Sequence, residues 1–202
     1  MSIRNPSITY LIASTGRETL KDTLRSLHGQ FAFGLDKVNL YFDGKCEKGL
    51  EFFKEELDMF GEDISYKVLD ETLGYWGHGV RNKYQYECST DYIHHMDDDD
   101  IYCEGCIPHV RSILKENYGK VIIFKFRTHG GRIVWSSKAI QSAEVGTPSG
   151  FIFNRPEIMG TWNFHYGGDY SFYEEVKEKI GMENLVFHEL LIVKTRPKDY
   201  GY

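Results

Sequence analysis

The chain has 202 residues, with 24 Lys and Arg against 30 Asp and Glu and a formal net charge of -6. Hydrophobic residues make up 41% and aromatic residues 15%, enough to build the core of one domain, which excludes a disordered or low-complexity chain. The acidic balance argues against a general nucleic-acid binder, and no apolar run approaches the roughly 20 residues that cross a bilayer. Residues 1–6 lack the apolar run of a secretory signal, so we expect a cytoplasmic protein.

The first part of the chain alternates between strand and helix patterns. Apolar and β-branched runs predict buried strands at 7–13, 38–42, 64–69, 92–96 and 121–126. Apolar residues at helical spacing predict helices between them, over 20–27, 50–60, 81–86 and 108–114. Strands that alternate with helices imply right-handed crossovers. We therefore predict an α/β fold with a doubly wound, mostly parallel sheet and helices on both faces.

From Thr128 the pattern loosens. Glycines and prolines at 130–131 and 147–150 and an aromatic stretch at 162–169 are typical of loops that build a site. Phe172, Val176 and Ile180 mark a last helix, and a short closing strand is predicted at 190–193. No repeat or linker divides the chain, so we expect one domain over 1–202.

The four cysteines, Cys46, Cys88, Cys103 and Cys106, are too few to cross-link a chain of this length, and we predict free thiols. Cys103 and Cys106 have the spacing of a redox pair or half a zinc site. No second Cys or His pair stands at ligand spacing, so a local feature at a helix start is the favoured interpretation.

Four consecutive aspartates, Asp97 to Asp100, follow the fourth predicted strand, and ligands in open α/β sheets bind at the carboxyl ends of strands. No Lys or Arg lies within six residues on either side, so a bound cation would offset the repulsion. Side chains alternate in an extended segment, so two of the four reach one ion. Oxygen ligands suit Mg²⁺ or Mn²⁺, which commonly completes its shell with substrate phosphates. The alternative is a solvated acidic loop or a helix cap.

Two other segments have the character of phosphate-binding loops. The glycine-rich segment 74–79 precedes Arg81, whose guanidinium can meet phosphate oxygens bidentately. Thr15, Gly16 and Arg17 form a turn before a helix, where backbone N–H groups can face an anion. Each signal is weak alone, because many such turns bind nothing.

A carboxylate and several histidines complete the candidates. Asp169 follows the aromatic stretch, where it could take a proton from a sugar hydroxyl or serve only as a helix N-cap. His94 and His95 lie within a strand and favour core roles, whereas His188 is a candidate late metal ligand.

Taken together these segments resemble the GT-A glycosyltransferases, in particular the family 2 type that uses nucleotide-diphosphate sugars. The resemblance runs from about residue 7 to 193. It implies a Rossmann-like GT-A fold with a nucleotide-sugar-binding part at about 1–127 and an acceptor-side part at about 128–202. The nucleotide-sugar contacts that it implies are Thr15, Gly16, Arg17, Asp43, Gly77, Arg81, Asn82, Asp97 and Asp98.

The aspartate run is similar to the family's Asp-x-Asp segment, with Asp97 and Asp99 in the two named positions. This implies Asp99 as the main ligand of Mn²⁺ or Mg²⁺, with help from Asp97 or Asp98. Gly168 and Asp169 resemble the Glu-Asp site whose Asp is the catalytic base. Gly168 departs from the usual Glu, so the assignment of the base rests on Asp169 alone.

The function that the resemblance implies is metal-dependent transfer of a sugar, by a hexosyltransferase, from a UDP-hexose or UDP-deoxyhexose donor to a hydroxyl of a glycan acceptor. Deprotonation of the acceptor by Asp169 would invert the anomeric centre, and a retaining route stays open if Asp169 does not face the acceptor. The short chain is similar to compact glycosyltransferases of large algal viruses, for which the compartment would be the host cytoplasm.

Three other classes of protein share some of these features. A sugar-phosphate nucleotidyltransferase would carry a longer Gly-rich loop after its first strand than the segment 14–17. An aspartyl-phosphate phosphatase would carry its Asp-x-Asp after the first strand rather than the fourth. A carbohydrate-binding module could use the aromatic residues and a calcium ion, but it would not need the strand-end nucleotide features.

Overall fold

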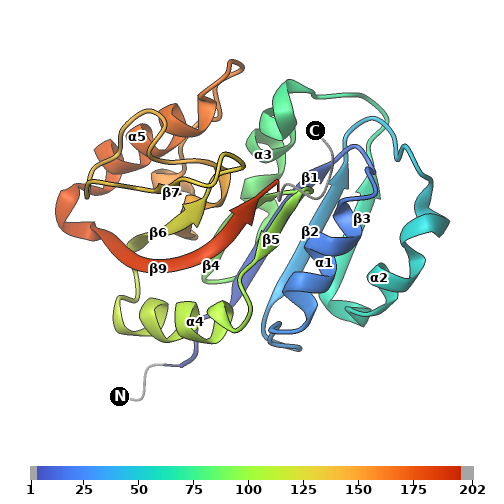
Figure 1. Cartoon of the computed structure of the whole chain (residues 1–202), viewed down its shortest axis with the longest axis horizontal. Coiled ribbons are helices and arrows are strands. Elements are labelled where there is room, and N and C mark those ends of the chain that lie inside the picture. Colours follow the sequence, from blue (N-terminus) through green and yellow to red (C-terminus); the bar gives the residue numbers. More distant parts are fainter. Residues whose placement is uncertain (1–3, 197–202) are drawn as a thin grey trace.

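The computed structural model of the protein describes residues 4–196 (Figure 1). Its strands are β1 (Ile8–Ser14), β2 (Lys37–Phe42), β3 (Ile64–Val68), β4 (Tyr92–Asp97), β5 (Asp100–Tyr102), β6 (Val121–Arg127), β7 (Ile133–Val134), β8 (Gly150–Phe153) and β9 (Leu185–Thr195). Its α-helices are α1 (Leu20–His28), α2 (Lys54–Asp58), α3 (His78–Tyr84), α4 (Cys106–Glu116) and α5 (Gly168–Ile180). The strands form one sheet in the order β3-β2-β1-β4-β8-β6-β9-β5, and β7 pairs with β6.

The four strands β3, β2, β1 and β4 are parallel, as predicted. All of β1 is buried, and its side chains alternate between the two faces of the sheet. Tyr10 and Ile12 belong to one core cluster with the apolar residues of α1 and α4, while Leu11 and Ala13 belong to the other with those of α3 and α5. The prediction of helices on both faces is confirmed.

The other half of the sheet is mixed. β8 lies between β4 and β6 and is antiparallel to both. The prediction that 147–150 forms a loop at the site is wrong: these residues are buried and lead into β8. A strand of four residues that begins on glycine is too short for its period to be recognised. β5 and β7, with three and two residues, were not predicted for the same reason.

β9 is the long curved strand in red in Figure 1. It covers eleven residues, of which the prediction included only 190–193. Register shifts on either side of Lys125 in its pairing with β6 interrupt the regular alternation, which explains the short prediction. The end of β9 pairs with β5, with Thr195 opposite Asp100, and so anchors the last aspartate of the run.

The helices follow the predicted order with shifted boundaries. The helix predicted at 50–60 is a 3-10 turn, Leu50–Phe53, followed by the short α2. α4 begins at Cys106, which places the Cys103 and Cys106 pair at a helix start, and all four cysteines are free thiols, as predicted. No helix within residues 4–196 has the length and apolarity that crossing a membrane requires.

His94 makes a pH-sensitive contact between β4 and β8. Its ring stacks on Phe151 at 4.1 Å between centroids, and Nδ1 donates to the carbonyl of Gly150 at 3.0 Å. Burial lowers the pKa of His94 to about 4. The unfolded chain therefore takes up the proton first, at its ordinary pKa of about 6.5.

The stabilising effect of a neutral His94 is complete above pH 6.5 and is lost as the pH falls towards 4, which amounts to about 3 kcal/mol. His94→Gln keeps a donor but does not titrate, so its free energy of unfolding should fall less steeply over this range. Urea unfolding at several pH values measures the slope. The exposed His109→Gln is the control, and a slope in His94→Gln equal to that of the unmodified protein contradicts the assignment.

Candidate active site

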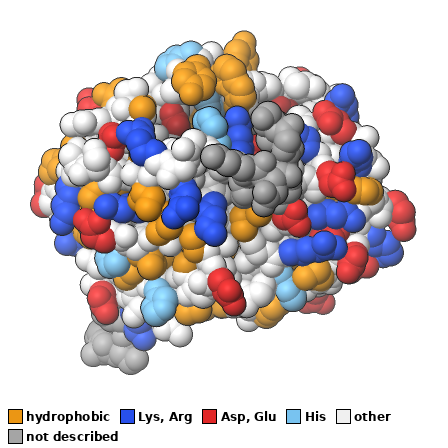
Figure 2. Space-filling view, viewed as in Figure 1, with side chains coloured by type: hydrophobic (Ala, Val, Ile, Leu, Met, Phe, Trp, Pro, Cys, Tyr) orange, Lys and Arg blue, Asp and Glu red, His pale blue; other side chains and the backbone are white. Residues whose placement is uncertain are grey.

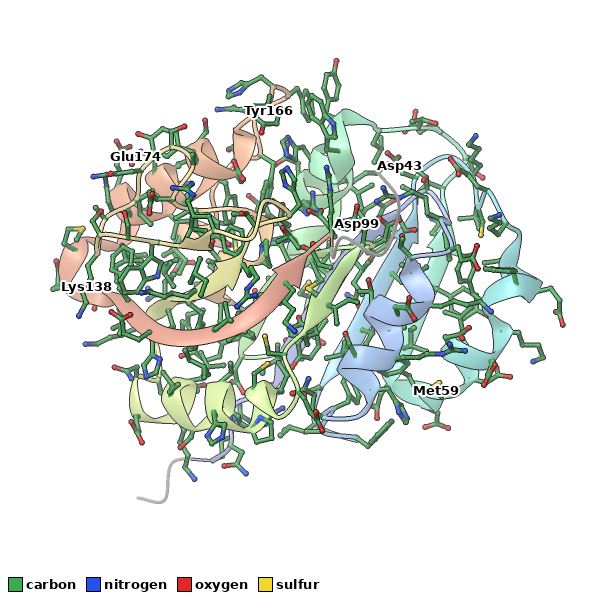
Figure 3. The ribbon with its side chains drawn as sticks, viewed as in Figure 1. Asp43, Met59, Asp99, Lys138, Tyr166 and Glu174 are labelled. Carbon is green, nitrogen blue, oxygen red and sulfur yellow. The ribbon has the colours of Figure 1, made fainter. Side chains whose placement is uncertain are left out.

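The predicted site residues lie at the edge where the parallel strands end. Ala13 is opposite Asp97, and Ser14 is opposite Phe42, so the segments that follow β1, β2 and β4 lie side by side. Figure 3 shows Asp43 and Asp99 at this edge. The sheet thus brings the turn at 15–17 and the start of the aspartate run together, as the sequence predicts.

Arg81 lies at the centre of this edge and is fully buried. Its guanidinium pairs with the carboxylate of Asp97 and donates to the carbonyls of Trp76 at 2.8 Å and Met96 at 3.3 Å. The ring of Trp162 lies 5.1 Å from the guanidinium carbon. Arg81 therefore positions Asp97 and the glycine-rich loop instead of presenting its charge to solvent, as a direct diphosphate contact would require.

Arginines from distant segments surround the aspartate run. Asp98 accepts from the Ser14 hydroxyl at 2.6 Å and pairs with Arg17. The Oδ2 atom of Asp99 lies 3.2 Å from Arg17 and 3.1 Å from Arg196. Both arginines are far from the aspartate run in sequence. The negative charge of the run, for which the sequence predicts a bound cation, is therefore compensated in part by protein side chains.

Burial and the neighbouring Asp97 carboxylate raise the pKa of Asp99 to about 6. Burial also raises the pKa of Asp100 well above its usual range. The nearby arginines lower these pKa values, but they do not outweigh burial together with the neighbouring carboxylates. Both carboxylate oxygens of Asp99 are buried without a hydrogen bond of good geometry, although the two arginines lie at ion-pair distance.

Two carboxylates of this site, those of Asp97 and Asp99, are candidate ligands for a divalent cation. Residues 4–196 contain no group of three or more His, Cys, Asp or Glu side chains placed to hold a metal. Mg²⁺, however, is commonly bound by one or two carboxylates together with water and substrate phosphates. Asp97, with a side chain 29% exposed, and Asp99, with oxygens lacking hydrogen bonds, have the required chemistry.

His188 does not belong to this site, and its prediction as a metal ligand is wrong. It lies on β9 opposite Phe124, which is in the middle of β6, and seven residues before Thr195, the residue that pairs with Asp100. At about 3.3 Å per residue the separation along the strand is roughly 20 Å. Its Nδ1 accepts the amide of Leu190 at 3.1 Å.

Asp43 organises the glycine-rich loop. Its carboxylate accepts the amides of Leu73 at 2.6 Å and Gly74 at 2.8 Å, which ties the loop to the end of β2. Both oxygens are thereby engaged. The prediction that Asp43 meets the base or ribose is not tested, but the structure gives its carboxylate a defined role in the loop.

Two predicted glycines are required by the close approach of the backbone. Gly77 has φ +83°, and a Cβ there would lie 2.6 Å from the Cβ of Ala13. Gly16 has φ +80°, and a Cβ there would lie 2.7 Å from the amide nitrogen of Glu47, whose N–H donates to the carbonyl of Thr15 at 2.8 Å. Both loops therefore lie tightly against their neighbours.

Asn82 fixes the aromatic stretch. Its side chain donates to the carbonyl of Trp162 and accepts the amide of the same residue, both at 2.8 Å. With both ends of the amide engaged, Asn82 joins α3 to the stretch before α5. Its predicted nucleotide contact is not tested.

Asp169 lies in the first turn of α5, but the N-cap is Gly167, so Asp169 is not a cap. Its carboxylate accepts the amide of Tyr170 at 2.8 Å. Burial raises the pKa of Asp169, and the nearby Asp97 raises it further, while Arg81 lowers it. The fold therefore brings the predicted base and the aspartate run within electrostatic reach of each other.

His78 is a member of the site that sequence reasoning missed. Its Nδ1 donates to the carbonyl of Asn163 at 2.8 Å, and burial lowers its pKa, so the imidazole is neutral at pH 7. A Cβ at position 168 would lie 2.6 Å from His78 Cε1 and 2.3 Å from the oxygen of Asn163. The departure from the expected Glu at Gly168 was the signal, because a ring packed there leaves no room for a side chain.

Comparison with known proteins places the fold. No protein-family model and no curated protein matches the chain. The crystal structure of S. aureus TarS matches with a TM-score of 0.76 at 12% identity, over 94% of this chain and 36% of that one. The structures of TarS 1-349 with UDP and with UDP-GlcNAc match with TM-scores of 0.72 and 0.70, also at 12% identity, over 94% of this chain and 60% and 58% of theirs.

The chain thus spans less than two thirds of each of these TarS chains. At this level of identity the likeness shows the fold, and the predicted Rossmann-like GT-A fold is confirmed.

Gly168→Ala tests the packing of His78 against α5. The added methyl group must displace the Asn163 carbonyl or the imidazole, so we expect a loss of about 1–3 kcal/mol in the free energy of unfolding. Urea denaturation measures it. Gly29→Ala is the matched control, since a Cβ there meets nothing within 4 Å. Equal stability of the two variants would contradict the packing.

Proposed function

We propose that this chain transfers a sugar from a UDP-sugar to a hydroxyl group of a glycan acceptor. The observation that carries the proposal is the placement of Asp169 and Asp97 around the same buried arginine at the carboxyl edge of the sheet. The likeness to structures of TarS in complex with UDP and with UDP-GlcNAc supports a nucleotide-sugar donor.

The donor lies against the ends of β1, β2 and β4 in this proposal. The turn at 15–17 offers the half-buried Arg17 to the nucleotide diphosphate, while the Gly16 amide already donates to the Ser14 hydroxyl at 2.8 Å. The glycine-rich loop, held by Asp43, covers the other side. Asp97 is fixed by Arg81, so its remaining carboxylate oxygen has a defined orientation towards the donor.

A Mn²⁺ or Mg²⁺ ion held by Asp97 and Asp99 would supply charge stabilisation for the leaving nucleoside diphosphate. Arg17 already lies beside Asp98 and Asp99, so its guanidinium can also stabilise the leaving phosphates. The positive and negative groups at this edge are therefore held in place before substrate binds.

Asp169 is the base in this proposal. The acceptor hydroxyl gives its proton to the Asp169 carboxylate as its oxygen attacks the anomeric carbon, and the bond from that carbon to the diphosphate breaks. One such displacement inverts the anomeric centre. Burial raises the pKa of Asp169, which makes its carboxylate a stronger base than that of an ordinary aspartate.

The metal is tested by the affinity for UDP. With Mn²⁺, calorimetry should give at least a tenfold tighter UDP complex than with EDTA, because without the ion two phosphates meet five carboxylates that three arginines compensate only in part. Asp99→Asn should abolish most of this difference. The exposed Asp70→Asn is the control and should retain it. Equal UDP affinity with Mn²⁺ and with EDTA would contradict the proposal that Asp97 and Asp99 hold a metal ion.

The base is tested by Asp169→Asn. Asp169 is not the N-cap, so the melting temperature and UDP affinity should stay nearly unchanged, while sugar transfer should fall by about 10²–10⁴-fold. The rate of the unmodified enzyme should rise with pH through a pKa displaced upwards from the usual 3.8, and the variant should lose this limb. Glu178→Gln, exposed on the same helix, serves as control. Unchanged transfer by Asp169→Asn at every pH would remove Asp169 from the mechanism.

A further inference from the structure

Four aromatic side chains stand exposed on one rim of the site. Tyr75, Trp76, Phe164 and Tyr166, here called the aromatic crest, have exposed fractions between 52% and 90%. Figure 2 shows hydrophobic side chains projecting from this rim at the top of the view, and Figure 3 labels Tyr166 there. Exposed aromatic groups gathered in this way commonly mark a binding surface.

The crest is built from two segments distant in sequence, the glycine-rich loop and the stretch before α5. Tyr75 stacks on Phe164 with centroids 4.4 Å apart and planes 11° apart. Trp76 meets Tyr166 edge-on at 6.3 Å. The two segments therefore present their rings as one surface.

The backbone that carries two of these rings adopts a strained conformation. Tyr75 and Trp76 have φ of 56° and 55°, the left-handed region that residues with side chains rarely adopt. The Trp76 carbonyl accepts from the buried Arg81 at 2.8 Å, which fixes this conformation. Strain that surrounding contacts maintain is characteristic of binding sites.

The crest is joined directly to the catalytic groups of the proposed reaction. Arg81 bonds both the Trp76 carbonyl and Asp97. Tyr166 lies three residues before Asp169, across the glycine pair at 167 and 168. A molecule lying on the crest is thus placed beside the carboxylate proposed to accept its proton.

We infer that the aromatic crest binds the acceptor by stacking its rings on the faces of hexopyranose units of a glycan chain. This inference rests on the proposed function and deepens it, since it names the residues that recognise the acceptor. The C–H faces of a pyranose pack against aromatic rings, and its hydroxyl groups are left at the edge, where the tyrosine hydroxyls and Asp169 can bond them.

The crest does not have the composition of a membrane anchor. The segments 74–79 and 162–169 contain no Lys or Arg and include Asp169, whereas attachment to an anionic lipid surface depends on basic residues. Carboxylates beside the rings favour hydroxyl-rich ligands instead.

Tryptophan fluorescence reports on the crest selectively. Of the three tryptophans, Trp135 and Trp162 are buried and Trp76 is exposed, so acrylamide quenches Trp76 preferentially. The probes are chitotetraose and cellotetraose, added to the full chain with UDP and Mn²⁺. Bound oligosaccharide should protect Trp76 from acrylamide, with a saturating effect that reduces the quenching constant at least twofold. Trp76→Phe should remove this change in quenching, which shows that it comes from Trp76.

Variants identify the surface. Phe164→Ala and Tyr166→Ala, both outside the donor-side glycine-rich loop, should each raise the half-saturating oligosaccharide concentration at least fivefold, with UDP affinity unchanged. Tyr66→Ala is the matched control, because Tyr66 is 48% exposed on the edge strand β3. Melting temperatures establish that each variant folds.

The outcomes separate this inference from the proposed function. If UDP binds but neither oligosaccharide protects Trp76, the inference is overturned and the proposed function stands. If UDP does not bind, the proposed function fails and the acceptor role fails with it. Protection by vesicles of phosphatidylcholine and phosphatidylglycerol in place of the oligosaccharides would overturn the inference in favour of a membrane surface.

Discussion

The buried contacts of Arg81 are the interaction on which the rest of the site depends. A guanidinium without solvent must have partners, since an uncompensated buried charge is costly. Its partners are the carboxylate of Asp97 and the backbone carbonyls of Met96 and Trp76. One side chain from α3 thereby sets the orientation of the first aspartate of the run and the path of the glycine-rich loop. The donor-side carboxylate and the outer rim of the site cannot move independently.

The carboxyl edge of the sheet carries an unusual concentration of charged groups. Five carboxylates, Asp97 to Asp100 and Asp169, meet Arg17, Arg81 and Arg196 there, so negative charge remains in excess when all are ionised. Burial raises the pKa values of Asp99, Asp100 and Asp169, and repulsion from neighbouring carboxylates raises them further. The excess negative charge favours binding of a cation and of a proton, the two species that the proposed transfer uses here.

Sequence periodicity predicted the parallel half of the sheet and the edge at which Asp43, Asp97 and Arg17 meet, because both follow from local patterns and from strand direction. It did not predict β8, whose place between β4 and β6 depends on long-range pairing, or the arginines that compensate the aspartates from distant segments. His188 was misassigned because residue type carries no information about the seven residues of strand that separate it from the site. Local sequence patterns contain no information on contacts and distances between segments that approach each other only in the folded protein.

The packing around Gly168, where the resemblance leads one to expect Glu, joins the two sides of the site. His78 fills the space beside Gly168, and its proton is held by the Asn163 carbonyl, while Asn82 grips the backbone of Trp162. Together with Arg81 these contacts bind α3 and the glycine-rich loop to the aromatic stretch and the start of α5. Any shift of that loop on donor binding must therefore carry the aromatic crest and Asp169 with it. In the proposed reaction, donor and acceptor would therefore both lie against this one packed unit, and the contacts that order the donor loop would also align the acceptor hydroxyl with Asp169.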